Sequence, residues 1–355
     1  MSASLREWGL DALQGVACTW APAVRAARRG PTVVALELNG QIDKRALAGV
    51  LALEDLEHLA LGQVKGITNA WLAKLGELPK LRSLDLWRTP LSDVGATALA
   101  VSRTLEWIDV RNTKIGDAGL AALARIPTLR QLSCTATTRM PDDGIRALAS
   151  AAKLEALAIV RPPFTLQATW IQQLTIDALA RCPRLRALSL YGVLGGCRLD
   201  ALGQLHELIE LSAGSSYHPA QRGWMADLVS LRRIECIDLS DCEFERPSDL
   251  APLASLEHLT DLNLWGARAT GPGEGPALSA VTCLVADAAW STCFQTPSGT
   301  PRSLCPGFSE SKGSSARSLT SSRRRWSTSS AGRNARRSHA AIAATRIGYA
   351  SSPFS

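Results

Sequence analysis

Aromatic residues and histidine are scarce in this sequence, and the usual metal-binding patterns are missing. Phenylalanine, tyrosine and tryptophan make up 5% of the 355 residues, and there are 5 histidines. None of the 9 cysteines forms a C-x-x-C pair, and no histidine lies beside them at the spacing of metal ligands. We therefore expect neither a metal site nor a cofactor. Since hydrophobic residues nevertheless reach 46%, aliphatic side chains must build the core.

Long apolar runs and a secretion signal are missing as well. The segment MSASLREWGLDALQG has no basic stretch followed by an apolar one, and no apolar run has the length of a membrane span. Scattered cysteines of odd number suit buried free thiols in a reducing compartment better than a disulfide framework. The sequence thus predicts a cytoplasmic protein without membrane association, and it leaves the oligomeric state open.

The formal net charge of +7 belongs to the end of the chain. Residues 268–355 contain 11 Lys and Arg but 3 Asp and Glu, whereas residues 1–267 hold 28 basic and 29 acidic side chains. The body of the protein is therefore neutral, and its net charge alone does not indicate nucleic-acid binding.

The clearest pattern present is a repeat of about 24 residues. The segments LRSLDLWRTPLSDVGATALA, LEWIDVRNTKIGDAGLAALA and LRQLSCTATTRMPDDGIRALA begin at Leu81, Leu105 and Leu129. They share the frame L-x-x-L-x-L-x-x-T, which is followed by Asp, Gly and Ala-Leu-Ala. Weaker copies bring the total to ten units and begin at Val33, Leu56, Leu154, Leu185, Leu208, Ile234 and Leu259.

Each unit predicts a short strand followed by a helix. Alternation places Leu84 and Leu86 on one face of the strand. Asp117 is expected to act as the N-cap of a helix in which Leu120 and Leu123 face inward together. One unit cannot bury its own apolar face, but stacked neighbours can, with a parallel sheet on one side and helices on the other.

The repeat resembles the leucine-rich repeat superfamily, and in its period and its D-x-G-L-x-x-L-A phrase most of all the ribonuclease-inhibitor-like and bacterial Thr-containing versions. The resemblance covers residues 33 to about 266 and implies an α/β solenoid, with a curved parallel sheet and helices on the convex side. The usual Asn of the L-x-x-L-x-L-x-x-N signature is Thr89, Thr113 and Thr137 in the clearest copies. A threonine hydroxyl in this position can still bond to the neighbouring loop backbone.

The two ends of the array call for covers. Apolar residues from Leu5 to Trp20 recur near helical spacing, so residues 1–32 are predicted to form an N-terminal helical cap, with an amphipathic helix over 3–29. The repeat array is predicted to span 33–267. The unit that begins at Leu154 carries an insertion, RPPFTLQATW, which is a second candidate for binding because insertions project from one face of a solenoid. A simple length variant is the alternative interpretation.

Residues 268–355 break the pattern, although a further L-x-x-L-x-L would be due near residue 283. The segment is rich in Ser, Arg, Pro and Ala, and such a composition buries too little apolar surface to offset chain entropy, so we expect a disordered basic tail. Three interpretations stay open: a tail that binds nucleic acid or acidic surfaces, an extension without a function, and a frame-shifted end of the coding sequence. The nucleotide sequence around codon 266 would distinguish the third.

Catalytic motifs are missing, because the sequence contains no phosphate-binding, dinucleotide-binding or zinc-protease signature. Ser215, Ser216, His218 and Asp227 offer the residue types of a hydrolase triad. No strained nucleophile turn or oxyanion hole accompanies them, so a polar loop between repeats is the better interpretation. We expect no catalytic residue and no enzyme.

Binding is the function class that remains. On a solenoid the outward strand positions line up, one per repeat, about 4.8 Å apart. Large aromatic side chains and arginines recur at these positions, and they are the residues that anchor interfaces. The predicted partner-binding residues are Asp85, Trp87, Arg88, Trp107, Asp109, Arg111, Tyr191 and Trp265.

We expect the tryptophans and arginines of the units at Leu81 and Leu105 to cluster between Asp85 and Asp109. The alternative is a set of scattered aromatic residues without a ligand. The sequence therefore predicts a non-enzymatic module that binds an unidentified protein on its concave sheet. The competing hypothesis is a protein associated with nucleic acid or acidic surfaces through its basic tail.

Overall fold

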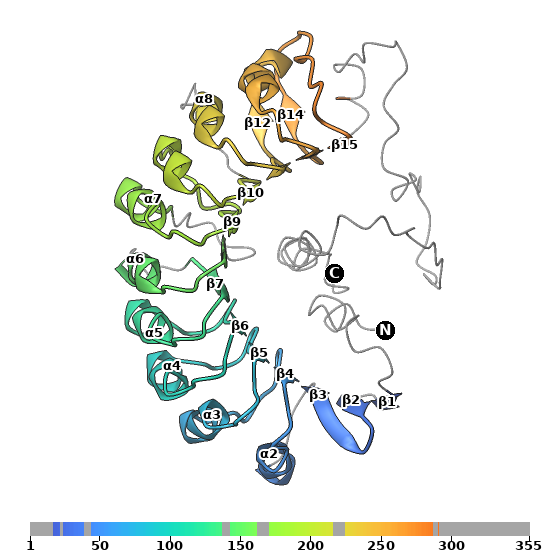
Figure 1. Cartoon of the computed structure of the whole chain (residues 1–355), viewed down its shortest axis with the longest axis vertical. Helices are drawn as coiled ribbons and strands as arrows, with labels where there is room; N and C mark the ends of the chain where they lie inside the picture. The colour runs from blue at the N-terminus through green and yellow to red at the C-terminus, as the bar shows by residue number, and fades with distance from the viewer. Residues whose placement is uncertain are drawn as a thin grey trace.

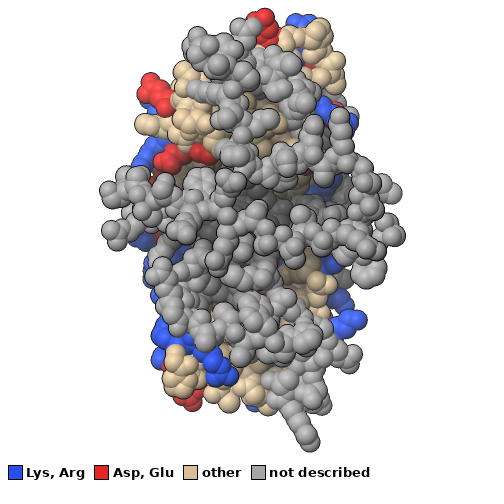
Figure 2. All heavy atoms as spheres, turned by 90° about the vertical axis from the view of Figure 1, so that its right-hand side faces the viewer, with Lys and Arg blue, Asp and Glu red and all other residues tan. Residues whose placement is uncertain are grey.

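The structure is a computed structural model that describes residues 17–21, 24–38, 44–136, 143–161, 170–215, 224–286 and 290. Short strands lie side by side along the inner edge of an arc, and helices line its outer edge (Figure 1). Figure 2 faces the concave side and shows Lys and Arg side chains along the rims of the arc. The predicted α/β solenoid, with its curved parallel sheet and convex helices, is confirmed.

Within the described residues the strands form one 13-stranded sheet and a separate two-stranded pair, β12 with β14. From β3 to β15 the large sheet is parallel, because each outer segment returns the chain to the same edge. The strands are β1 (Ala17–Ala21), β2 (Val24–Arg29), β3 (Thr32–Leu38), β4 (His58–Ala60), β5 (Ser83–Asp85), β6 (Trp107–Asp109), β7 (Gln131–Thr135), β8 (Ala156–Val160), β9 (Ala187–Ser189), β10 (Glu210–Ser212), β11 (Cys236–Asp238), β12 (Glu243–Phe244), β13 (Asp261–Leu264), β14 (Arg268–Ala269) and β15 (Cys283–Ala286).

In the outer layer, 3-10 helices become more frequent toward the C-terminal end. The α-helices are α2 (Lys44–Leu51), α3 (Asn69–Gly76), α4 (Asp93–Leu99), α5 (Asp117–Leu123), α6 (Asp143–Ala147), α7 (Gln173–Leu179) and α8 (Trp224–Asp227). The 3-10 helices are η2 (Leu148–Ser150), η3 (Asp200–Gln204), η4 (Leu228–Ser230) and η5 (Pro247–Ser255).

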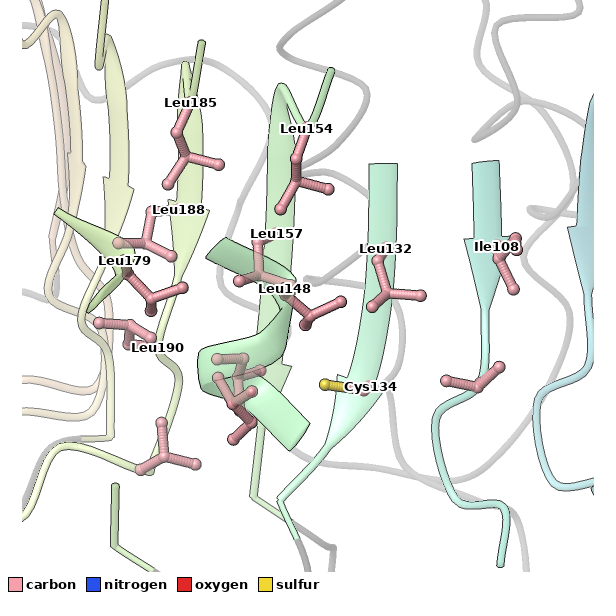
Figure 3. Packing of buried hydrophobic residues seen from close by; sticks show 14 of the residues in the cluster. Ile108, Leu132, Cys134, Leu148, Leu154, Leu157, Leu179, Leu185, Leu188 and Leu190 are labelled. Atoms are coloured by element: carbon pink, nitrogen blue, oxygen red, sulfur yellow. The ribbon is translucent and has the colours of Figure 1, made fainter. Parts of the chain in front are cut away.

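The core is a row of leucine layers between the sheet and the helices. Leu81, Leu84 and Leu86, the three apolar positions of one L-x-x-L-x-L segment, are fully buried. The equivalent residues of successive strands stand side by side, as Ile108 and Leu132 do in Figure 3. Full burial of such a side chain stabilises the fold by about 1.5–3 kcal/mol, so the repeated leucines account for the stacking of the units.

The turn after each strand explains the threonines of the repeat. Arg88 and Asn112, which stand at the eighth position of their units, have positive φ angles of 55° and 57°. The next residue then donates its hydroxyl back to the strand: Thr89 Oγ1 bonds to the carbonyl of Leu86 at 2.7 Å, and Thr113 Oγ1 makes the same bond one unit later. The expected role of the threonine is confirmed at these two positions, and Thr137 lies outside the described residues.

The aspartate of the repeat joins neighbouring units, and its predicted role as an N-cap is wrong. Helix α5 begins at Asp117, and Gly116 occupies the cap position. The Asp117 Oδ1 accepts the N–H of Gly144 in the next unit at 2.7 Å. In the same way, Asp93 accepts the N–H groups of Gly116 and Gly119 at 2.6 and 3.0 Å. Each carboxylate therefore satisfies amides at the start of the following helix, because the helices are stacked with their first turns side by side.

The predicted N-terminal helix is wrong for residues 17–21 and 24–29, which form β1 and β2. These strands pair antiparallel and continue the sheet beyond β3. Gly30 makes the turn into β3 with a φ of +64°. A hairpin satisfies the backbone of the first repeat strand, which a helix packed on the core would leave unpaired. The other residues of the predicted cap lie outside the described part.

The predicted end of the array at residue 267 is also wrong. β15 pairs in parallel with β13, and Val281 and Ala286 are buried. The segment VTCLVA keeps the apolar positions of the repeat with Val and Ala in place of Leu, so the pattern was too weak to recognise. Trp290 is 1% exposed, packs edge-on against Phe244 at 5.7 Å, and donates its Nε1–H to the carbonyl of Ala267 at 2.7 Å.

The repeat array therefore continues through β15, and Trp290 packs against its core. Residues 291–355, which carry most of the predicted basic tail, lie outside the described part, and their predicted disorder stays a prediction.

Candidate functional site

Three columns of side chains face the concave side, and strand pairing fixes their alignment. The strand-start column passes through Ser83, Trp107 and Gln131, which are register partners. The strand-centre column passes through Asp85, Asp109 and Ser133 in the same way. The strand-end column comes two residues later and contains Gly62, Trp87, Arg111, Thr135, Val160, Tyr191, Gly214, Ser240 and Trp265.

The structure divides the predicted cluster in two. Trp87 and Arg88 lie together, with the Arg88 Cζ 5.0 Å from the centroid of the Trp87 ring, and the ring lies against Gly62 of the preceding unit. Trp107 is the register partner of Ser83, which precedes Trp87 by four residues. At a rise of about 3.3 Å per residue the two tryptophans are therefore attached about 13 Å apart along the strands.

The aspartates of the strand-centre column support the backbone. The Asp85 Oδ1 accepts the N–H of Trp87 at 2.8 Å, and Asp109 accepts that of Arg111 at 2.9 Å. Asp109 is 2% exposed and also binds the Arg111 guanidinium through both of its oxygens. These charges are thus directed at the turn that follows each strand, and they orient the strand-end residues.

Trp107 stands at one side of a shallow, open depression in the middle of the sheet. Its floor consists of small side chains, because the units at Leu154 and Leu185 carry alanine and serine at the outward positions. The lining includes Trp107, Gln131, Ala156, Ala158, Ala187 and Ser189. Ser189 is 4% exposed, and its hydroxyl has no hydrogen-bond partner within the described structure.

Tyr191 and Trp265 lie farther along the concave face, and a carboxylate not predicted from the sequence stands between their units. The Tyr191 hydroxyl donates to Asp241 Oδ2 at 2.6 Å. The ring reaches across Gly214, where an added Cβ would lie 2.8 Å from Tyr191 Cε2. Trp265 is 48% exposed, and its carbonyl accepts the N–H of Asp241 at 2.8 Å.

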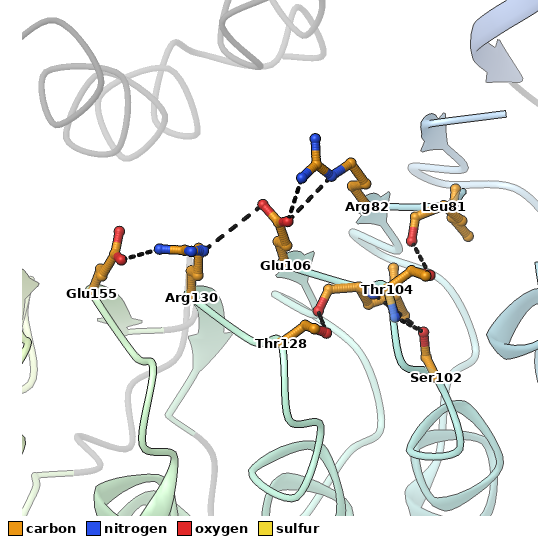
Figure 4. A network of polar contacts seen from close by, with 9 residues as sticks. Leu81, Arg82, Ser102, Thr104, Glu106, Thr128, Arg130 and Glu155 are labelled. Atoms are coloured by element: carbon orange, nitrogen blue, oxygen red, sulfur yellow. Dashed lines mark hydrogen bonds and ion pairs between the residues drawn. The ribbon is translucent and has the colours of Figure 1, made fainter. Parts of the chain in front are cut away.

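A ladder of alternating charges along the edge of the sheet was also missed by sequence reasoning. Arg82 Nη2 lies 2.8 Å from Glu106, whose other oxygen is 4.0 Å from Arg130, and Arg130 pairs with Glu155 (Figure 4). The signal was present, because the residue after the first leucine alternates in sign from Glu57 to Arg186. Exposed pairs of this kind contribute about 0–1 kcal/mol each.

The remaining candidates from the sequence do not form a site. Asp227 accepts the N–H of Leu199 at 2.9 Å, whereas Ser216 and His218 lie outside the described residues. Of the insertion, Trp170 is described and lies against Gly195, and residues 162–169 are not described. Within the described part there is no group of His, Cys, Asp and Glu that could hold a metal ion, and no helix long and apolar enough to cross a membrane.

Six cysteines are free thiols buried to different degrees: Cys134, Cys182, Cys197, Cys236, Cys242 and Cys283. Burial raises the pKa of Cys134 to about 12, with a smaller contribution from Asp109, and raises the pKa of Cys182 to about 11. Both thiols are therefore protonated at neutral pH, which is the state of a packed side chain rather than a nucleophile.

Comparison with known proteins supports the repeat assignment. A family model described as Leucine Rich repeat matches residues 77–100 and 101–124, which are two consecutive units. The search of curated proteins found no relative of this chain.

Among solved structures, an internalin from Listeria monocytogenes is 22% identical, with 68% of this chain and 70% of that chain covered and a TM-score of 0.43. A structure of the Toll–Spatzle complex of Drosophila is 18% identical, with 65% and 29% covered and a TM-score of 0.47. A plant peptide hormone receptor, RGFR1 in complex with RGF2, is 14% identical, with 67% and 40% covered and a TM-score of 0.35. The chain thus spans less than half the length of these two receptor chains.

Proposed function

We propose that this chain, which is a leucine-rich repeat protein, is a non-enzymatic module that binds a partner protein on the concave face of its solenoid. The observation that carries the proposal is the depression beside Trp107, which combines a large aromatic side chain, a floor of methyl groups and the buried hydroxyl of Ser189. Aromatic anchors in desolvated pockets supply much of the free energy of protein association.

The other predicted residues extend this surface. Trp87 with Arg88, and Tyr191 with Trp265, place aromatic rings on both sides of the depression along the array. Asp85, Asp109 and Arg111 contribute indirectly, because they fix the turns from which these side chains project. A surface of this kind spans several repeats, which suits a protein segment better than a small molecule.

Site-specific photo-cross-linking in cells tests the proposal. A photo-reactive phenylalanine analogue at position 107 is expected to give a defined protein adduct. The matched control carries the analogue at Val94, which is 65% exposed on helix α4 of the convex side. Replacing Trp87 and Trp107 with alanine should leave folding intact and remove the adduct formed from a neighbouring concave position, Gln131. Adducts from Val94 alone, or an adduct at Gln131 that survives both replacements, would contradict the proposal.

The competing hypothesis of a tail that binds nucleic acid rests on residues outside the described part. Its test requires a deletion that begins after Trp290, because β15 and Trp290 belong to the array. A salt-dependent affinity for DNA that disappears in this deletion would favour it.

A further inference from the structure

The C-terminal part of the concave face has a carboxylate, that of Asp241, held in a fixed position in the unit next to that of the half-exposed Trp265. Asp241 is exposed and has a φ of 56°, and the hydroxyl of Tyr191 donates to its Oδ2 at 2.6 Å. Its Oδ1 lies against Gly266, where an added Cβ would collide with it. The carboxylate is thus oriented from the unit of β9 and from the unit of β13, and its position does not depend on a ligand.

Trp265 supplies the second half of this arrangement. It directly precedes Gly266, and its backbone carbonyl accepts the N–H of Asp241 at 2.8 Å. Although it is one of the large hydrophobic side chains of the array, 48% of its surface is exposed. The face of an indole ring attracts a cation within about 6 Å, and most strongly where a carboxylate is close by.

The charged residues at the described positions of the three concave columns are mostly acidic. The acidic residues of these columns are the half-buried Asp85 and Asp261 and the buried Glu37, Asp109, Glu210 and Asp238. Arg111 is the one Lys or Arg of these columns within the described residues, and it is paired with Asp109. From β10 onward the described positions of the columns contain acidic residues and neither Lys nor Arg.

The pKa of the Cys236 thiol responds to the same negative charges. Its pKa is raised by burial first, and then by the nearby carboxylates of Asp261, Glu210 and Glu235. An apolar partner would desolvate these carboxylates without compensation, and an acidic partner would be repelled. Charge complementarity therefore selects a cationic partner for this part of the face.

We propose that Asp241, Tyr191 and Trp265 receive an arginine side chain from an arginine-rich segment of the partner protein. The proposal rests on the protein-binding function proposed above and adds the chemistry of the partner. A guanidinium is planar, so it can stack on the indole of Trp265 while its N–H groups donate to the Asp241 carboxylate, whereas an ammonium makes one of these contacts well. The exposed Asp241 and the half-buried Asp261 attract the remaining basic side chains of the segment.

Peptide titration with the full chain tests this inference. The probe is an acetylated and amidated peptide with arginine at every third position and alanine elsewhere, compared by calorimetry with its lysine and glutamate counterparts. The arginine peptide is expected to bind more tightly than the lysine peptide, and the glutamate peptide not at all. Its affinity should fall as NaCl rises, because the contacts are partly exposed.

Asp241→Asn is the decisive variant. Asparagine tolerates the positive φ angle and keeps an acceptor for the Tyr191 hydroxyl, so the fold is retained while the charge is lost. The Kd of the arginine peptide should rise about tenfold. Trp265→Ala, at a half-exposed position, should act similarly and removes the arginine preference over lysine. The matched control, Asp200→Asn, removes an exposed carboxylate from the outer side of the unit of β9 and should change nothing.

Three results would overturn the proposal. One is an unchanged Kd in Asp241→Asn, and another is absence of binding at millimolar arginine peptide. The third is tighter peptide binding after Arg323, Arg324 and Arg325 are replaced with serine, which would make the chain's own end the occupant. The cross-linking test at position 107 is independent of these results, so a failure of the arginine site and a failure of the protein-binding function can be told apart.

Discussion

Replacing Gly119 with alanine should destabilise the array, because this glycine allows the close approach of two neighbouring helices. An added Cβ would lie 2.5 Å from Asp93 Oδ1 and 2.5 Å from Ile115 Cγ1. The Asp93 oxygen must then move, although it accepts the N–H groups of Gly116 and Gly119 at 2.6 and 3.0 Å. The substitution therefore disturbs both the packing and the bonds that join two units.

The magnitude follows from these contacts. Overpacking costs about 1–3 kcal/mol. Complete loss of a hydrogen bond to a charged acceptor costs about 1.5–3 kcal/mol, and weakening the two bonds to Asp93 costs part of this free energy. Alanine returns about 0.5–1 kcal/mol through its helix preference. We expect a net loss of about 2–4 kcal/mol in the free energy of unfolding, and a urea midpoint lowered by about 1 M.

The assay is urea unfolding followed by circular dichroism, and the chain offers a control of the opposite sign. Gly49 lies in helix α2, is exposed, and has no atom within 4 Å of an added Cβ. Gly49→Ala should therefore stabilise the protein by about 0.5–1 kcal/mol. In an Asp93→Ala background, Gly119→Ala should cost less, since one of the two collisions is removed. Stability of Gly119→Ala equal to or above that of the parent would refute the reasoning.

Other predictions concern the end of the array, the thiols and the charge ladder. Trp290→Ala should lower the free energy of unfolding by about 3–5 kcal/mol in the same assay, because a fully buried indole and its bond to Ala267 are lost. An unchanged urea midpoint would place this residue outside the core. Cys134 and Cys182 should react with a disulfide reagent at pH 8 only at the rate at which the protein unfolds. Burial raises both pKa values above the ordinary 9.0, so thiolate forms in the folded state only above about pH 11. Fast labelling of these thiols in native buffer would contradict this. Glu106→Gln should lower stability by about 1 kcal/mol or less at low salt and by still less at high salt, and a larger effect would show that the ladder with Arg82 and Arg130 is stronger than exposed ion pairs usually are.

Repetition made the scaffold predictable from the sequence. A single L-x-x-L-x-L segment is ambiguous, but units that agree in register and period define the strands, their buried leucines and the stacking direction together. The alignment of Asp85 with Asp109, and of Trp87 with Arg111, could be read from the sequence because parallel strands of equal units must pair in register. Where the repeat weakens at Val281 and Leu284, the sequence prediction ended too early.

The relation between units was decided only by the tertiary structure. Asp117 has the spacing of an N-cap, yet it stands inside the first turn of its own helix, with Gly116 at the cap position, and its carboxylate accepts the N–H of Gly144 in the next unit. Likewise Trp87 and Trp107 belong to neighbouring units, but Trp107 begins β6 whereas Trp87 follows the end of β5. Asp241 joins the candidate site only because the side chain of Tyr191 reaches it across Gly214. Periodicity reports which face a residue occupies. Which atoms meet across neighbouring units depends on distances that no single unit contains, and the candidate site is made of such contacts.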